Sequence, residues 1–311
     1  MTTMLATPAL ARPADQASRL RDIVEALVRE RDAPLRAHAA PALRPGIPII
    51  AIGSGKGGVG KTNLAVNLCI ALARSGRRAT LLDADLGMAN ADVLCGLSPH
   101  RRLDALLVAH DAPAHLSMRD VAVDAPGGFL LVPGAVGVAR VADLDARRRT
   151  ALVAGLAELE SVSDLVVIDT GAGIGRDVTT FMLAASLAIV VATPEPTSIA
   201  DAYGLIKCLH LLTRERGSTL PRLGLVVNQA RSEPEASAVH ARLSSCAGRF
   251  LGVDVPFFGW IAQDSRVSAS VRNRLPHSIR WPRARASRDV RRLSTSIIAS
   301  LGAAPPSHRN G

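Results

Sequence analysis

Residues 47–68 read IPIIAIGSGKGGVGKTNLAVNL and constrain the possible fold more than any other part of the chain. An apolar run of the kind found in buried strands leads into a glycine-rich turn, and a helical pattern follows at once. Within this segment, residues 55–62 fit G-x-x-x-x-G-K-[ST], the pattern of a loop that wraps phosphate between a strand and a helix. The segment therefore predicts a P-loop nucleotide-binding fold.

The residue types of this loop suit a bound nucleotide. Glycines let the backbone curve around a phosphate without Cβ clashes, so that its N–H groups and the helix N-terminus point at the anion. We expect Lys61 to neutralise the β and γ phosphates and the Thr62 hydroxyl to ligate Mg²⁺. The predicted nucleotide contacts in the loop are Gly55, Lys56, Gly57, Gly58, Val59, Gly60, Lys61, Thr62 and Asn63.

Two later strand patterns end in carboxylates. Asp83 and Asp85 occur in LLDADLG, and Asp169 occurs in VVIDTGAG, two residues before Gly171. Because an α/β sheet forms its ligand crevice at the carboxyl ends of its strands, we expect all three carboxylates to lie near the loop. Gly171 is expected beside the γ-phosphate.

Short β-branched runs alternate with longer helical patterns from residue 48 onward. The predicted strands cover residues 48–52, 79–83, 164–169, 187–192, 222–228 and 256–260, and the predicted helices cover 62–75, 198–213 and 286–301. This alternation is typical of an α/β fold with a doubly wound, mostly parallel sheet. Aromatic residues make up only 3% of the chain, which suits a sheet buried on both faces by aliphatic side chains.

The sequence ahead of this domain has a different character. Residues 15–31 place apolar side chains at helical spacing, with Asp15 as the N-cap. A stretch rich in Ala, Pro and Arg follows and shows no periodicity. We therefore divide the sequence into an N-terminal helix segment, a linker, the main domain and a tail, at residues 1–31, 32–47, 48–303 and 304–311.

The sequence carries no recognisable signal for export or membrane insertion. Its first fifteen residues lack the early positive charge of a secretory signal, and the longest apolar stretch, residues 181–192, is too short to span a bilayer. The cysteines lack the C-x-x-C spacing of metal or redox sites and are expected to be reduced core residues. They are Cys69, Cys95, Cys208 and Cys246. These features predict a cytoplasmic protein.

The net charge of +10 is carried almost wholly by arginine, since lysine occurs only at positions 56, 61 and 207. Residues 266–292 hold nine arginines and a single acid, Asp289. Such a region either decorates a solvated surface or contacts an anion, namely DNA, RNA or an anionic lipid surface. The sequence leaves both interpretations open.

The additional lysine of the loop adds a family resemblance. The segment SGKGGVGKT resembles the deviant Walker motif of the MinD/ParA ATPases, P-loop proteins of the SIMIBI class. The resemblance implies that Lys56 reaches across an ATP-dependent homodimer to the phosphates of the partner. It also implies that Lys56, Lys61 and Asp85 are the catalytic residues, with Asp85 orienting or activating the attacking water.

The same resemblance implies a set of Mg²⁺ ligands and adenine contacts. Thr62, Asp83 and Asp169 match the residues that hold Mg²⁺ in the family. Asn228 and residues 261–264, including Asp264, match the segments that flank adenine. ATP is favoured over GTP because the guanine-reading motif N-K-x-D cannot occur here, where the lysine outside the loop, Lys207, follows Ile206.

Several longer stretches resemble one branch of the family, the flagellar number regulators of the FlhG/FleN type. They are LLDADLGMANADVLCGL, VIDTGAGIGRDVTTFMLAA, TPEPTSIADAYGLIK and VVNQARSEPEA. In this branch an N-terminal D-Q-A-x-x-L-R element engages and stimulates an SRP-type GTPase, the flagellar placement factor FlhF. The matching residues are Asp15, Gln16, Ala17, Leu20 and Arg21. A helix that packs on its own domain is the alternative.

The resemblance thus implies a dimerising switch ATPase that regulates flagellar number and placement. It adds a flagellar master transcription factor as a partner, with Asp201 as a candidate contact, and attachment to the inner face of the cell membrane through a C-terminal amphipathic helix. We expect residues 286–301 to be the last core helix, with a membrane-lying helix as the alternative.

Two other functions of the same fold compete with this one. A ParA-like DNA-partition ATPase would bind DNA phosphates through residues 266–292 without reading the base sequence. An iron–sulfur reductase or cluster carrier is disfavoured, because the segment around Asp169 lacks cysteine.

Overall fold

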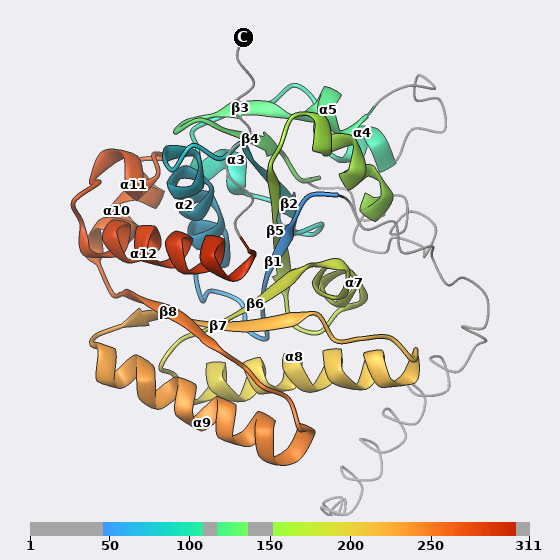
Figure 1. The fold of residues 1–311 in the computed structure, drawn as a ribbon. Helices are drawn as coiled ribbons and strands as arrows, with labels where there is room; N and C mark the ends of the chain where they lie inside the picture. Colours follow the sequence, from blue (N-terminus) through green and yellow to red (C-terminus); the bar gives the residue numbers. More distant parts are fainter. Residues whose placement is uncertain (1–45, 108–116, 136–151, 303–311) are drawn as a thin grey trace, which may run out of the picture. The chain divides into compact units, whose positions relative to one another are not determined.

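The computed structural model describes residues 46–107, 117–135 and 152–302, which lie in one of the chain's two units, Leu43–Gly311. Its strands are β1 (Ile49–Ser54), β2 (Ala79–Ala84), β3 (Val123–Ala125), β4 (Phe129–Val132), β5 (Leu165–Ala172), β6 (Leu187–Ala192), β7 (Arg222–Ala230) and β8 (Phe257–Ala262). They form one sheet in the order β3-β4-β2-β5-β1-β6-β7-β8 (Figure 1). Neighbouring strands are parallel except for the antiparallel pair β3 and β4.

Helices cover both faces of this sheet (Figure 1). In the described part of the chain they are α2 (Lys61–Arg74), α3 (Ala91–Leu94), α4 (Asp104–Leu107), α5 (Met118–Val121), the 3₁₀ helix η1 (Leu156–Ser161), α7 (Arg176–Ala184), α8 (Pro196–Glu215), α9 (Glu233–Leu251), α10 (Ser265–Arg272), α11 (His277–Arg280) and α12 (Arg285–Ser300). Helices α2 and α12 build one hydrophobic core with the sheet, and α7, α8 and α9 build the other. The predicted doubly wound, mostly parallel sheet is confirmed.

Strand β1 supplies side chains to both cores. All of its residues are buried. Ile49 and Ala51 join the core of α7, α8 and α9, whereas Ile50 and Ile52 join the core of α2 and α12. Successive side chains of a strand point to opposite faces, so a strand covered on both faces reads as an unbroken apolar run.

Strand register brings the carboxyl ends of β1, β2 and β5 together at one end of the sheet. Asp169 in β5 is the ladder partner of Asp83 in β2 and of Ile52 in β1. Strand β1 then ends at Ser54 and runs directly into the glycine-rich loop. The loop, Asp83 and Asp169 therefore lie at the same end of the sheet.

Helix α12 belongs to the core. Val290, Leu293 and Ile297 are 1%, 2% and 0% exposed, and they pack in the same core as the apolar side of α2. Arg288 and Arg292 lie exposed on the other side of the helix. The burial supports the interpretation as a core helix, since insertion into a membrane would remove these side chains from the domain. No helix in the described residues has the length and apolar character needed to cross a membrane.

The predicted elements of the main domain are confirmed in type and order, with ends displaced by at most three residues. The prediction missed the pair β3 and β4, although Gly127 and Gly128 between them have the positive φ values, 97° and 86°, that favour glycine in a tight hairpin. It also missed α9, where Ser232 accepts a hydrogen bond from the Glu235 N–H as an N-cap. The N-terminal helix segment, its candidate partner contacts, most of the linker and the tail lie outside the described residues.

Candidate functional site

The glycine-rich loop joins the end of β1 to the start of α2. Gly58 and Gly60 have φ values of 78° and 88°, a left-handed conformation that glycine adopts without strain. Gly60 is the N-cap of α2, so the first free N–H groups of the helix face the loop. Val59 is buried and anchors the turn to the core that contains α2 and α12. This geometry fits a backbone cradle for phosphate.

Two neighbouring elements press closely on the loop. A Cβ atom at Gly55 would lie 2.0 Å from the backbone oxygen of Asp201 in α8. A Cβ atom at Gly60 would lie 2.5 Å from Nδ2 of Asn228 at the end of β7. Glycine is therefore needed at position 55 for space, whereas a side chain at position 60 would displace the Asn228 amide. Asp201, predicted as a partner contact, lies exposed with its backbone against the loop.

Lys61 begins α2 and is only 7% exposed. Burial lowers the pKa of its ammonium group, and the nearby carboxylates of Asp169 and Asp85 oppose that shift. Lys61, Asp169 and Asp85 thus form one electrostatic cluster beside the loop. A cation in this position suits the negative charge of a triphosphate.

Asp169 is fully buried, and neither of its carboxylate oxygens has a hydrogen-bond partner among the described residues. Burial raises its pKa well above the usual value, and Asp83 raises it further, whereas the nearby Thr62 hydroxyl and Lys61 lower it. A buried carboxylate without partners is costly, and a cation bound beside Asp169 would remove that cost. Asp169 and Thr62 therefore fit the predicted Mg²⁺ site.

Asp83, unlike Asp169, accepts hydrogen bonds from backbone N–H groups. One of its oxygens accepts hydrogen bonds from the N–H groups of Asn90 and Ala91, both at 2.9 Å, and the other accepts one from Asp85 at 3.2 Å. Burial raises the pKa of Asp83 to about 6, although these backbone hydrogen bonds lower it. Asp83 therefore fastens the segment that follows β2 to the start of α3. Its predicted contact with Mg²⁺ stays a prediction.

Asp85, which follows β2, lies beside Gly171 in β5. A Cβ atom at Gly171 would stand 3.5 Å from Oδ1 of Asp85. The same oxygen accepts a hydrogen bond from the Met88 N–H at 3.2 Å, and Asp85 remains partly exposed. This position leaves the carboxylate at the rim of the loop, where a water molecule can reach it.

Asp169 and Thr62 are the two side chains that could hold a metal ion beside the loop. No group of three or more His, Cys, Asp or Glu side chains suited to a metal ion occurs in residues 46–107, 117–135 and 152–302. An ion beside Asp169 and Thr62 would take its remaining ligands from phosphate and water. Mg²⁺ is commonly bound in this way, through one or two carboxylates together with substrate phosphates.

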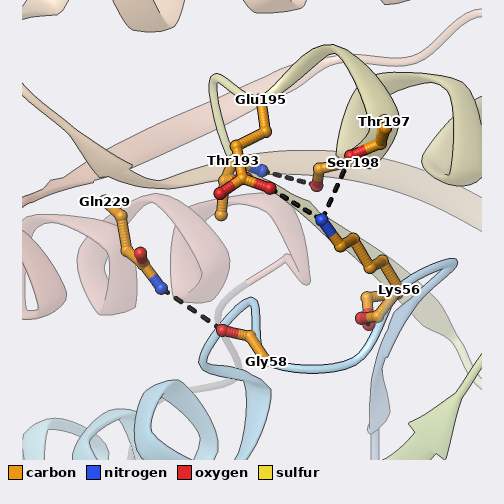
Figure 2. Close-up of polar contacts among 8 residues, drawn as sticks. Lys56, Gly58, Thr193, Glu195, Thr197, Ser198 and Gln229 are labelled. Atoms are coloured by element: carbon orange, nitrogen blue, oxygen red, sulfur yellow. Dashed lines mark hydrogen bonds and ion pairs between the residues drawn. The ribbon is translucent and has the colours of Figure 1, made fainter.

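Lys56 points to α8 of its own chain (Figure 2). Its Nζ atom lies 2.7 Å from Oε2 of Glu195 and 3.1 Å from Oγ1 of Thr197. The turn that presents these residues is fixed by a hydrogen bond from the Thr193 N–H to Ser198 Oγ at 2.9 Å. The sequence analysis did not single out Glu195 or Thr197, although both lie in the segment TPEPTSIADAYGLIK.

The remaining predicted contacts lie further along the chain. Asn63 accepts a hydrogen bond from Asn67 one turn along α2. Asn228 reaches the loop and donates to the Val59 carbonyl at 2.7 Å. Asp264 is the N-cap of α10, where it accepts from the Arg266 N–H at 3.0 Å. The predicted adenine contacts of Asn228 and Asp264 stay predictions.

Residues 50–277 match the family model of the CobQ/CobB/MinD/ParA nucleotide-binding domain. The chain belongs to this family. Like other MinD/ParA proteins it is an ATPase that uses ATP and Mg²⁺. The motif resemblance seen in the sequence is thereby confirmed.

Individual MinD/ParA relatives cover most of the chain. It is 39% identical to the antiactivator FleN of Pseudomonas aeruginosa, over 84% of this chain and 90% of FleN. It is 30% identical to the flagellum site-determining protein YlxH of Helicobacter pylori, over 72% of this chain and 73% of YlxH. The crystal structure of the cell division ATPase MinD of Pyrococcus furiosus matches with a TM-score of 0.66 at 25% identity, over 82% of this chain and 99% of that MinD chain.

Proposed function

We propose that this MinD/ParA ATPase is a nucleotide-dependent switch that regulates the number and placement of flagella. Similarity to FleN and YlxH over most of the chain supports the flagellar part of the proposal. The observation that carries the ATPase site is the clustering of Lys61, Asp85 and Asp169 beside the glycine-rich loop.

Each residue of the proposed site has a chemical task. The N–H groups of the loop and the Lys61 ammonium group bind the phosphates, and Thr62 and Asp169 hold Mg²⁺. When bound, Mg²⁺ neutralises charge on the β and γ phosphates. Asp85, at the rim beside Gly171, orients a water molecule for attack on the γ-phosphate.

The proposed switch is a two-fold dimer that ATP closes and hydrolysis opens. Lys56 of each chain reaches the phosphates of its partner in the closed state. Nucleotide shifts a binding equilibrium only if the two states differ in affinity for a partner. Met88 and Ile174, in the segments that follow β2 and β5, are 76% and 59% exposed, and large apolar side chains at this edge support its burial in a second state.

The proposed partner of the N-terminal helix segment is the SRP-type GTPase FlhF. The test is GTP turnover by FlhF with the full-length chain, with Gln16→Ala and with Ser18→Ala. We expect stimulation by the parent and by Ser18→Ala, since position 18 is variable in D-Q-A-x-x-L-R, and its loss in Gln16→Ala. Equal stimulation by all three would exclude this motif, and none by the parent would remove FlhF from the proposal.

A flagellar master transcription factor is the second proposed partner, with Asp201 on the exposed side of α8 as a candidate contact. The test measures binding of that factor to Asp201→Asn and to the parent, both in the presence of ATP. Loss of binding without loss of nucleotide affinity is the expected result.

DNA partition remains a second candidate function, because the nine arginines of residues 266–292 are all exposed. The single acid among them, Asp289, accepts a hydrogen bond from the Ala262 N–H at 3.0 Å. Non-specific DNA binding of this kind weakens steeply with salt, because neutralised phosphates release counterions. DNA affinity that falls with a steep salt slope would favour partition, and undetectable binding at low salt would exclude it.

A further inference from the structure

A β-bulge lies at the end of β7. Between Val227 and Ala230, this strand contains one residue more than the facing stretch of β8. A bulge bends its strand and redirects side chains, and bulges are frequent beside active sites. Here it falls on Asn228 and Gln229, next to the phosphate loop.

Gln229 has a left-handed backbone conformation, with φ of 59°. Among the non-glycine residues that the structure describes, this conformation is shared only with Arg274, which has φ of 51°. Left-handed backbone is unfavourable for a residue with a Cβ atom, and it persists where surrounding contacts enforce it. Contacts around Gln229 must therefore hold its backbone in this conformation.

Two adjacent side-chain amides bind two adjacent carbonyl groups of the loop. Asn228 Nδ2 donates to the Val59 carbonyl at 2.7 Å, and Asn228 Oδ1 accepts the Gln229 N–H at 2.9 Å, which fixes the orientation of the amide. Gln229 Nε2 donates to the Gly58 carbonyl at 3.4 Å (Figure 2). Both amide donors belong to β7, so they contact the glycine-rich turn from outside it.

Binding these carbonyl groups also orients N–H groups. In a planar trans peptide the C=O of one residue and the N–H of the next point in opposite directions. The Gly58 carbonyl shares its peptide plane with the Val59 N–H, and the Val59 carbonyl shares its plane with the Gly60 N–H. Carbonyl groups held outward by Asn228 and Gln229 therefore leave these two N–H groups directed to the inner side of the turn.

We propose that Gln229, together with Asn228, is a positioning residue that orients the loop N–H groups for phosphate before nucleotide binds. A loop that is already ordered loses less conformational freedom on binding, which raises affinity. Gly60 fits the same arrangement, because only glycine allows Asn228 to approach so closely. The inference rests on the proposed binding of phosphate by residues 55–62.

Gln229→Met is the first test variant, because methionine keeps the length of the side chain, adds no charge and lacks the amide donor. Calorimetry with ADP on the full chain should show affinity about threefold to tenfold weaker than the parent. Hydrogen exchange of the Val59 and Gly60 amides should be faster in the nucleotide-free variant. Exchange is the readout that a merely structural role at the end of β7 would leave unchanged.

Gln229→Gly separates loop positioning from backbone strain. Glycine relieves the left-handed conformation, so the thermal midpoint should stay equal or rise while ADP affinity falls. Arg274→Gly is the matched control, since it relieves the same conformation away from the loop and should bind ADP as the parent does.

Lys61→Ala distinguishes failure of the inference from failure of the site. Parent-like ADP affinity in Lys61→Ala would overturn both the loop assignment and the inference. Loss of binding in Lys61→Ala, with parent-like affinity and amide exchange in Gln229→Met and Gln229→Gly, would overturn the inference alone.

Discussion

Lys56 forms an ion pair with Glu195 of its own chain, with Nζ 2.7 Å from Oε2. The lysine that the family resemblance assigns to the partner's phosphates is therefore held on α8 in this state. It must leave Glu195 and Thr197 before it can cross an interface. The side chains of Lys56 and Glu195 are 39% and 64% exposed, so the pair opposes that movement only weakly.

Removing this ion pair should favour the ATP-bound dimer. An exposed pair contributes about 0.2–1 kcal/mol, and a two-fold dimer breaks two of them, so Glu195→Gln should lower the dimer dissociation constant by up to about thirtyfold. Sedimentation equilibrium with a non-hydrolysable ATP analogue measures the change, and Glu233→Gln, at an exposed glutamate of α9, is the control. Weaker assembly of Glu195→Gln would mean that Glu195 acts within the closed dimer instead.

Gly55 and Gly57 should respond differently to the same substitution. In Gly55→Ala the new Cβ atom meets the Asp201 backbone at 2.0 Å, so we expect a loss of about 2 kcal/mol or more in unfolding free energy. In Gly57→Ala its nearest neighbour is Ala172 Cβ at 4.0 Å, and the change should stay within about 1 kcal/mol. Urea unfolding without nucleotide measures both, and equal losses would contradict the proposed close approach of α8.

Asp85→Ala should bind ATP and fail to hydrolyse it. If Asp85 acts on the attacking water, turnover should fall about a hundredfold or more, and the ATP-bound dimer should accumulate. Phosphate release and the retention of labelled nucleotide measure the two effects. Turnover at the parent rate would exclude Asp85 from the mechanism.

His277 should make the domain sensitive to acid. It is 3% exposed, its Nδ1 lies 2.8 Å from Ser287 Oγ, and burial lowers its pKa to about 4, opposed by Asp264. The unfolded chain, with a histidine pKa of about 6.5, binds the proton more readily, so the stabilisation is complete above that pH. About 3 kcal/mol should be lost as the pH falls from about 6.5 to about 4.

The matched variant for this acid limb is His277→Gln, which cannot take up a proton. Its unfolding free energy should change less than that of the parent between pH 7 and pH 5, whatever its stability at pH 7. Parallel curves for the two proteins in urea unfolding at several pH values would contradict the assignment to His277.

The phosphate loop and the parallel sheet could be predicted because their determinants are local. The glycines, Lys61 and Thr62 are adjacent in sequence, and buried strands reveal themselves by apolar runs. Contacts between distant segments could not be predicted in this way. Lys56 and Glu195 are 139 positions apart, and their meeting depends on the place of β6 beside β1 in the sheet.

Gln229 gave no sequence signal for a different reason. Glutamine is not among the residue types enriched in left-handed backbone, so no local rule points to a bulge at this position. Asp83 shows the opposite case, since an aspartate at the end of an apolar strand pattern is a local signal, and the register sets it beside Asp169. Its hydrogen bonds to Asn90 and Ala91 depend on the path of the following turn, which the sequence pattern leaves undetermined.

The packing of α12 against α2 has a consequence for synthesis of the protein. The apolar side of α2, the helix that begins with Lys61, shares its core with residues 285–300. On the ribosome, the apolar side of α2 stays uncovered until residues 285–300 have emerged. A shorter nascent chain therefore contains the whole phosphate loop but lacks the helix α12 that packs against α2. A nascent chain released before Arg285 would carry every nucleotide-binding residue of the loop and still be a target for chaperones and proteases.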